Sequence, residues 1–295
     1  AEKSSPGAAI HPGYHFCKGL YNKYSRNLPE ALVELNQARK DSEWGVKAAA
    51  EMLDVYLDPS GIATDPALEL PAALPEPETV RAARSLRQEL EEARHLKPAQ
   101  VSLYKAYELL LTGSRQAVED SLNHFSDVVS QEKESAAALL GLSYALILLK
   151  QDAKARNHLK RISKMVYTSE EAEALEKGYL LYADMHVHNG KNDLAQELCR
   201  KCLTHNKSCA RAWEVQGLIF EKDGAHSDAA QVYEMAWQYD NQRNPQVGYK
   251  LAFNYLKAKR YVEAINVCHS VLKVQANYPK MRKEILDKAR ASLRP

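Results

Sequence analysis

Apolar residues recur along this chain at spacings of three and four, the pattern of helices that each bury one face. A much longer period is laid over this one. Gly217 stands four residues after Trp213 and three before Phe220. The same frame recurs on either side, and its small anchors, 34 and 35 residues apart, are Ala183, Gly217 and Ala252. A second small residue follows each anchor twelve residues later, at Ala195, Ala229 and Ala264. The pattern predicts a repeated pair of helices.

A period near 34, with the order Trp, small residue and aromatic followed by Ala and a further aromatic, resembles the tetratricopeptide repeat (TPR). Each such repeat is two antiparallel helices, A and B, that cross closely where a small residue leaves room. Because one pair cannot bury its apolar face alone, successive pairs stack. We therefore expect an all-α chain, an α-solenoid of TPR helix pairs. The anchor residues are interpreted as core.

The frame divides the chain into segments. It predicts TPR-like helices at residues 1–57, degenerate repeats at 78–171, three well-formed repeats at 172–276, and a basic capping helix at 277–295. Between them, residues 58–77 hold five of the twelve prolines, several acidic residues and no Lys or Arg. Proline at this density opposes helix, so an acidic, flexible loop is expected. In the helix predicted to follow it, Arg81, Arg84 and Arg87 are interpreted as a solvated face.

Composition narrows the class of protein. The 295 residues are 45% hydrophobic and 26% charged, and the net charge of +2 gives no field that would attract nucleic acid. No uncharged apolar run reaches membrane-spanning length, so no membrane insertion is expected. The start lacks Met and a signal core, which suggests a piece of a longer protein. Five unevenly spread cysteines favour reduced thiols in the cytoplasm.

Two groups of residues could carry chemistry. Cys199, Cys202, His205 and Cys209 have a spacing suggestive of zinc, but the first two occupy inner offsets of a helix B, where a small buried side chain explains them. His186 holds the aromatic offset after Ala183 and is expected to be packed in the core. No nucleophile–base pattern is evident. We expect neither an enzyme nor a metal or cofactor site.

In a TPR stack the A helices line the concave wall. The side chains expected to face it are Leu180, Asp184, Glu214, Leu218, Glu221, Tyr249, Phe253 and Leu256. This wall is acidic and apolar, with Lys177 and Arg211 at its rim. A partner helix, apolar or basic, suits it, while packing on adjacent repeats is an equally good explanation of its apolar members. Co-chaperone TPR domains grip a terminal carboxylate with Lys, Asn and Arg on this wall, so the sequence disfavours that function.

The C-terminal helix is a second candidate surface. Residues 277–295 hold six basic and two acidic residues, including Lys280, Arg282 and Lys283. A solvated cap is the simpler explanation. Docking on an acidic partner, such as a neighbouring subunit or a filament, is the alternative.

Several less repetitive segments resemble one family. They are HFCKGLY at 15–21, PEAL at 29–32, NQARKD at 36–41, SCARAWE at 208–214 and NYPKMRKEIL at 277–286. They are similar to the C-terminal part of the large TPR subunit of intraflagellar transport complex A. The resemblance implies a non-catalytic scaffold in retrograde ciliary transport and ciliary assembly.

By the same resemblance, the partners are other complex A subunits with WD40 and TPR domains, and neighbouring transport trains. The location is the cytoplasm, the cilium or flagellum and the basal body. A soluble peptide-binding adaptor of the co-chaperone type is the rival function. An enzyme that uses Cys199 or His186 is a third, and would need these side chains exposed.

Overall fold

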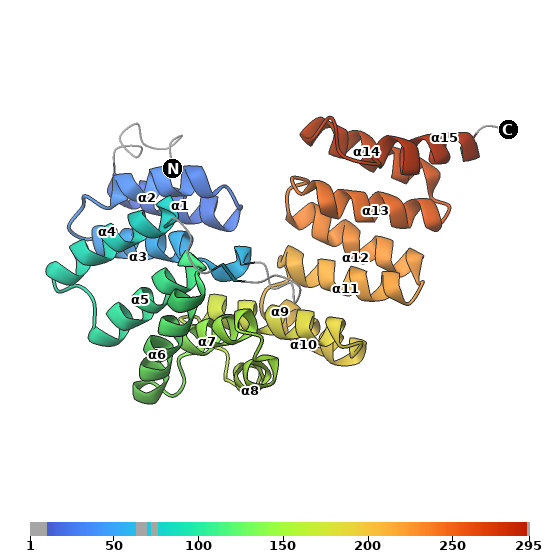
Figure 1. Cartoon of the computed structure of the whole chain (residues 1–295). Helices are drawn as coiled ribbons and strands as arrows, with labels where there is room; N and C mark the ends of the chain where they lie inside the picture. The colour runs from blue at the N-terminus through green and yellow to red at the C-terminus, as the bar shows by residue number, and fades with distance from the viewer. Residues whose placement is uncertain (1–10, 63–69, 72–75, 294–295) are drawn as a thin grey trace. The chain divides into compact units, whose positions relative to one another are not determined.

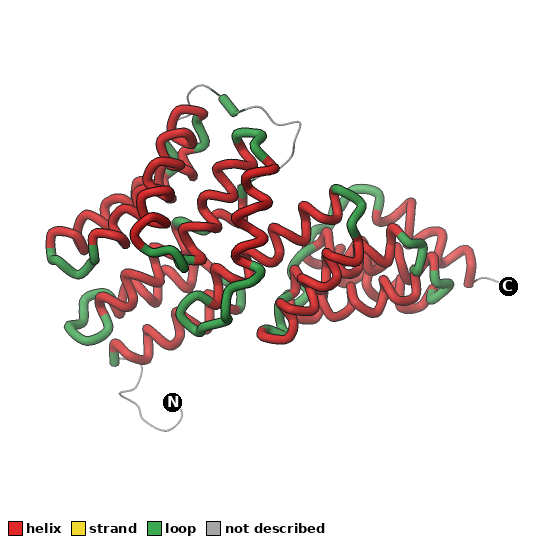
Figure 2. The backbone as a smooth tube through the Cα atoms, turned by 90° about the horizontal axis from the view of Figure 1, so that it is seen from below, coloured by secondary structure: helices red, strands yellow, loops and turns green. Residues whose placement is uncertain are grey.

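The computed structural model describes residues 11–62, 70–71 and 76–293, and within them the regular elements are helical (Figures 1 and 2). The chain divides into two compact units, residues 1–177 and 178–295. In each unit, consecutive antiparallel helices stack on their neighbours, so the predicted all-α solenoid of helix pairs is confirmed. No helix of the described residues is long and apolar enough to cross a membrane.

The first unit begins with α1 (Pro12–Tyr24), α2 (Leu28–Ala38) and α3 (Gly45–Tyr56), and a short 3-10 turn, η2 (Pro59–Gly61), follows. It continues with α4 (Glu78–Glu92), α5 (Pro98–Thr112), α6 (Arg115–Gln131), α7 (Ala136–Leu148) and α8 (Asp152–Ile162). The unit boundary falls within α9 (Ala172–His188). Proline at the first turn of α1, α2 and α5 costs no hydrogen bond, because that N–H has no partner in a helix.

The second unit holds the rest of α9, then α10 (Asn192–His205), α11 (Ala210–Lys222), α12 (His226–Tyr239), α13 (Pro245–Lys257) and α14 (Tyr261–Val274). It ends with a π-helical segment, η3 (Met281–Leu286), and α15 (Asp287–Leu293). A single capping helix was expected here. Instead, Lys280 has a left-handed φ of 65°, and a π-helical turn then brings Met281 and Ile285 into the core at 0% exposure.

The small anchors lie at the helix crossings, as the repeat frame requires. A Cβ added to Gly217 on α11 would lie 2.7 Å from Cε1 of Tyr233 on α12. In the first unit, one added to Gly141 on α7 would lie within 3 Å of three carbons of the Phe125 ring on α6. Both rings are fully buried. The missing side chain therefore makes room for an aromatic ring, not only for the small residue on helix B.

The turns between helices A and B share one backbone conformation. Gly190, between α9 and α10, and Gly224, between α11 and α12, have left-handed φ values of 69° and 73°. Lys259, at the equivalent position one repeat later, has a φ of 62° without being glycine. The turn geometry is set by the stacked helices, and the third repeat tolerates the strain.

The acidic, proline-rich segment makes contacts at both of its ends. Pro59 is buried in η2, and the Asp58 carboxylate lies 3.0 Å from Lys177 Nζ. At the other end the Pro71 carbonyl accepts a hydrogen bond from the Arg115 N–H, and Glu76 pairs with Arg84. Residues 63–69 and 72–75 lie outside the described part, so the flexibility predicted for them stays a prediction.

The expectation of a solvated arginine face on α4 is wrong for Arg87. Its side chain is only 4% exposed, and Nε donates to Oε1 of Glu108 on α5 at 2.6 Å. Glu108 is 3% exposed and also accepts from Arg84. The spacing along α4 alone places Arg87 on the outward face. It cannot reveal the partner carboxylate, which lies 21 residues away in the sequence.

Candidate partner-binding surfaces

Several of the polar residues expected on the concave wall contact one another in the second unit. We call the expected residues, with their polar partners, the helix-A face: Leu180, Asp184, Arg211, Glu214, Leu218, Glu221, Tyr249, Lys250, Phe253, Asn254 and Leu256. Polar contacts join it from helix to helix. Arg211 on α11 donates to both carboxylate oxygens of Asp184 on α9 at 3.1 Å, and to Glu214 at 2.7 Å. Lys250 on α13 lies 2.8 Å from the other Glu214 oxygen.

The same pattern continues towards the end of the unit. Asn254 of α13 is fully buried, donates to Glu221 at 2.9 Å and lies 2.8 Å from the ring nitrogen of His226. The Tyr249 hydroxyl donates to Glu284 of η3 at 2.8 Å. Burial, together with this contact, raises the pKa of Tyr249 to about 12. Helices α9, α11 and α13, and η3 after them, are thus each joined to the next in this series by a charged or amide group.

The ion pairs change the electrostatics expected of the wall. Burial would raise the pKa of Glu214, but Arg211 and Lys250 outweigh it and hold that pKa below its usual range. Burial likewise opposes the charge on Arg211, yet Asp184 and Glu214 hold its pKa above the ordinary value. Arg211 and Lys250 therefore balance the charges of Asp184 and Glu214, while Glu221 is paired with the neutral Asn254 amide. Lys250 and Asn254, adjacent to the frame positions, were not identified, and Arg211 bridges Asp184 and Glu214.

The apolar members of the helix-A face are half-buried. Tyr249, Phe253 and Leu256 pack against the buried core of the second unit. Phe253 also meets the His226 ring edge-on, with ring centroids 6.2 Å apart. Leu180 and Leu218 are of intermediate exposure. These side chains support adjacent helices and still present part of their surface to solvent.

The cysteines belong mainly to the core. Cys199 and Cys268 are fully buried, and burial raises the pKa of each thiol to about 12. His186 is 7% exposed and packs on Tyr182, with ring centroids 4.3 Å apart. The interpretation of these residues as packing is confirmed. An enzyme that used Cys199 or His186 would need that side chain to be exposed, and neither is exposed.

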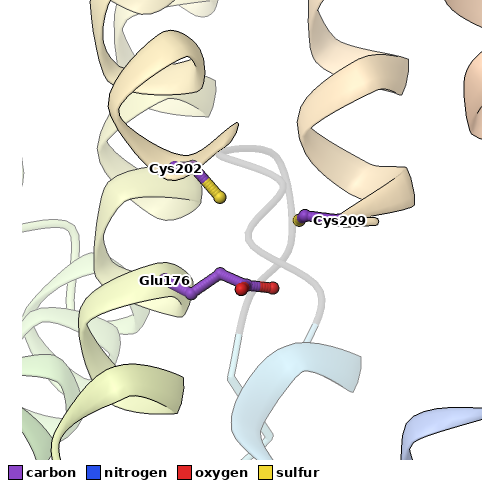
Figure 3. Close-up of side chains that lie close together, drawn as sticks. All are labelled: Glu176, Cys202 and Cys209. Carbon is purple, nitrogen blue, oxygen red and sulfur yellow. The ribbon is translucent and has the colours of Figure 1, made fainter. Parts of the chain in front are cut away.

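Only part of the suggestive zinc spacing is brought together. Cys202 near the end of α10 and Cys209 before α11 have sulfurs within 4.8 Å of each other (Figure 3). His205 is exposed and Cys199 is in the core. Glu176, the third side chain in Figure 3, lies in the part of α9 that belongs to the first unit. Two thiols fall short of the four ligands of a closed zinc site.

The basic C-terminal surface is present as expected. Lys280, Arg282 and Lys283 are exposed on and beside η3. Glu284 lies between them in sequence, but its carboxylate is shared by Tyr249 and Lys280. The cations thus stand on a segment whose apolar side is anchored in the core.

In the first unit, a charged cluster escaped the sequence analysis. Lys23 of α1, with a side chain 9% exposed, lies 2.7 Å from Glu51 of α3 and 2.9 Å from Glu173 at the start of α9. Asp54 lies 4.0 Å from the same amine. Burial raises the pKa of Asp54 to about 6. Because Lys23 and Glu173 are 150 residues apart, only the fold could pair them.

Known families also match this chain. The family model of the tetratricopeptide repeat protein 21 C-terminal ARM domain matches residues 82–290, and that of the TT21 fifth ARM repeats domain matches residues 1–57. The chain belongs to the tetratricopeptide repeat protein 21 family. It is 45% identical over its whole length to tetratricopeptide repeat protein 21B of Mus musculus, and 30% identical to the tetratricopeptide repeat protein 21 homolog of Caenorhabditis elegans.

The chain spans only 23% of the length of these relatives. Among solved structures, the Cut9–Hcn1 complex of APC/C aligns over 98% of this chain and 51% of its own, with a TM-score of 0.59 at 12% identity. That likeness shows the fold alone. The family membership, in contrast, supports the resemblance drawn from the short segments of the sequence.

Proposed function

We propose that this chain is a non-catalytic scaffold segment of the large TPR subunit of intraflagellar transport complex A, acting in retrograde ciliary transport and ciliary assembly. Membership of the tetratricopeptide repeat protein 21 family carries the proposal, together with the segments that resemble that subunit. Its partners are the other complex A subunits with WD40 and TPR domains, and neighbouring trains. It works in the cytoplasm, at the basal body and in the cilium or flagellum.

The helix-A face favours a scaffold over a peptide adaptor. A carboxylate clamp needs free Lys, Arg and Asn side chains on this face. Arg211, Lys250 and Asn254 are there, but each is already engaged by Asp184, Glu214 or Glu221. A peptide carboxylate would have to displace these pairs and leave a half-buried glutamate unpaired. The partly exposed Leu180, Leu218, Phe253 and Leu256 suit an apolar segment of a partner subunit better.

The exposed Lys280, Arg282 and Lys283 form the second part of the proposed interface. These three side chains are exposed, so an acidic partner surface could pair with their charges at little cost to the stability of the fold. In this arrangement the helix-A face supplies apolar contact area, and the C-terminal surface supplies orientation.

The test is affinity purification of the tagged chain from ciliated cells, followed by identification of the bound proteins. We expect complex A subunits. Leu218→Glu on the helix-A face, and the triple variant Lys280→Glu/Arg282→Glu/Lys283→Glu, should each lower their recovery. Leu194→Glu is the matched control, because Leu194 is 45% exposed on α10. Recovery of chaperones without complex A subunits would favour the adaptor and refute the scaffold.

A further inference from the structure

The first unit carries a second basic surface, on the outer side of α8. Between residues 150 and 164 there are six basic side chains and one acidic one, Asp152. The exposed cations are Lys150, Lys154, Lys160, Arg161 and Lys164, while Arg156 is half-buried. The opposite side of the helix, Ala155, Leu159 and Ile162, has no exposed surface. Lys154, Lys160 and Arg161 thus lie on the exposed side of α8, Lys150 and Lys164 flank its two ends, and Arg161 also donates to the Lys133 carbonyl.

An apolar tip stands next to this face. The chain leaves α8 at Ile162 and re-enters a helix at Ala172. In between, Val166 is 83% exposed, more than any other large hydrophobic side chain among the described residues, and Tyr167 is 36% exposed. A solvated loop does not require an apolar side chain here. Packing within the first unit does not explain it either, since Val166 is left almost bare.

We propose that the outer face of α8, together with Val166 and Tyr167, docks on an anionic membrane surface. Clustered lysines and arginines are drawn to acidic headgroups, each contributing about a fivefold gain in affinity, and a projecting apolar residue enters the boundary beneath them. The 11-residue helix would lie flat on the membrane, because it is too short to span one.

Shape decides between a membrane and an acidic peptide. Repeat proteins hold peptides in the concave face, where several helices surround the ligand. The α8 cations project from one outer helix, which offers a strip and not a groove. A flat anionic surface meets all of them at once. Val166 adds a further reason, because a bilayer offers its side chain an apolar environment and a chain of carboxylates does not.

The experiment is co-sedimentation of the whole 295-residue chain with vesicles of phosphatidylcholine, with and without about 30 mol% phosphatidylserine. We expect binding to the acidic vesicles only, weakening as salt is raised because the charges are screened. Lys154→Glu/Lys160→Glu/Lys164→Glu should lower the partition coefficient by about 100-fold or more. The matched control is Lys97→Glu/Lys133→Glu/Lys273→Glu, at exposed lysines from three separate segments, which changes the net charge equally and should retain most of the binding.

The apolar tip is tested separately. Val166→Ser should weaken binding to acidic vesicles several-fold, while Val262→Ser, at a position 55% exposed on α14, should not. Circular dichroism confirms that each variant stays helical. Equal binding to both vesicle types, no binding, or equal loss in the two triple variants would overturn the proposal. Binding to polyglutamate that depends on the α8 lysines, without vesicle binding, would assign the face to an acidic protein segment instead.

Discussion

The two units hold their helices together by different means. In the second unit small anchors lie under large rings, as at Gly217 and Tyr233, and the ion pairs that join one helix to another lie along the helix-A face. In the first unit, ions enter the interior, where Arg87 meets Glu108 between α4 and α5. Lys23 ties α1 to α3 and to the start of α9. Both units use small anchors, since Gly141 lies against Phe125 in the first. They differ in where the charges between helices lie: inside the first unit, and along one face of the second.

The largest expected effect follows from breaking the buried pair of the first unit. Arg87→Met leaves Glu108 buried without its main partner, and we expect the free energy of unfolding to fall by about 3–5 kcal/mol. Urea denaturation, with hydrogen exchange resolved on α4 and α5, measures it. Arg87→Met/Glu108→Leu should recover most of the loss, because no uncompensated charge remains. A single variant as stable as the parent would show that the pair is not needed there.

A smaller effect is expected at the anchor of the second unit. Gly217→Leu forces a side chain into the space of the Tyr233 ring, and the overpacking should cost about 1–3 kcal/mol. The melting temperature should fall accordingly. Gly61→Leu is the control, because a Cβ there meets nothing within 4 Å. An unchanged melting temperature for Gly217→Leu would mean that the crossing is not where the repeat frame places it.

The smallest effect is a difference in pH dependence between the units. Glu214 has a lowered pKa, so its pairing stabilises the second unit above the ordinary glutamate pKa and is lost as pH falls through the lowered one. Asp54 behaves oppositely. Its pKa is raised from 3.8 to about 6, so its contribution to the first unit is lost as pH rises across that interval.

Hydrogen exchange followed from about pH 7 to about pH 3, which spans the titration of both carboxyl groups, is compared at α11 and at α3. It distinguishes the two signs after correction for the intrinsic exchange rate. Glu214→Gln should remove the first trend, and Asp54→Asn the second. Parallel trends in both units would contradict the assignment of these carboxyl groups. The effect is small because about half of the Asp54 side chain is exposed, which lets solvent screen its charge.

The sequence identified the repeat architecture because small and aromatic residues at a fixed period are a local signal. Gly217, Tyr233, Cys199 and His186 are buried as that frame requires. It identified the acidic residues of the helix-A face but missed Lys250 and Asn254, because partners from the next helix, some 33 to 36 residues away, decide whether a wall is acidic or neutral. The sequence at 280–286 was compatible with an ordinary helix, and the structure has a π-helical segment there, with Met281 and Ile285 buried.

What the sequence by itself determined is the class of fold, the register that separates buried from exposed positions, and the family. These depend on periodicity and on short segments, which the linear order preserves. What only the tertiary structure decided is the state of the charges. Arg87 is buried, Lys23 is shared by distant acids, Asp184 and Glu214 are paired with cations, and the α8 cations are left outward near Val166. Electrostatic free energy depends on distance and burial in three dimensions, and spacing along the chain fixes neither.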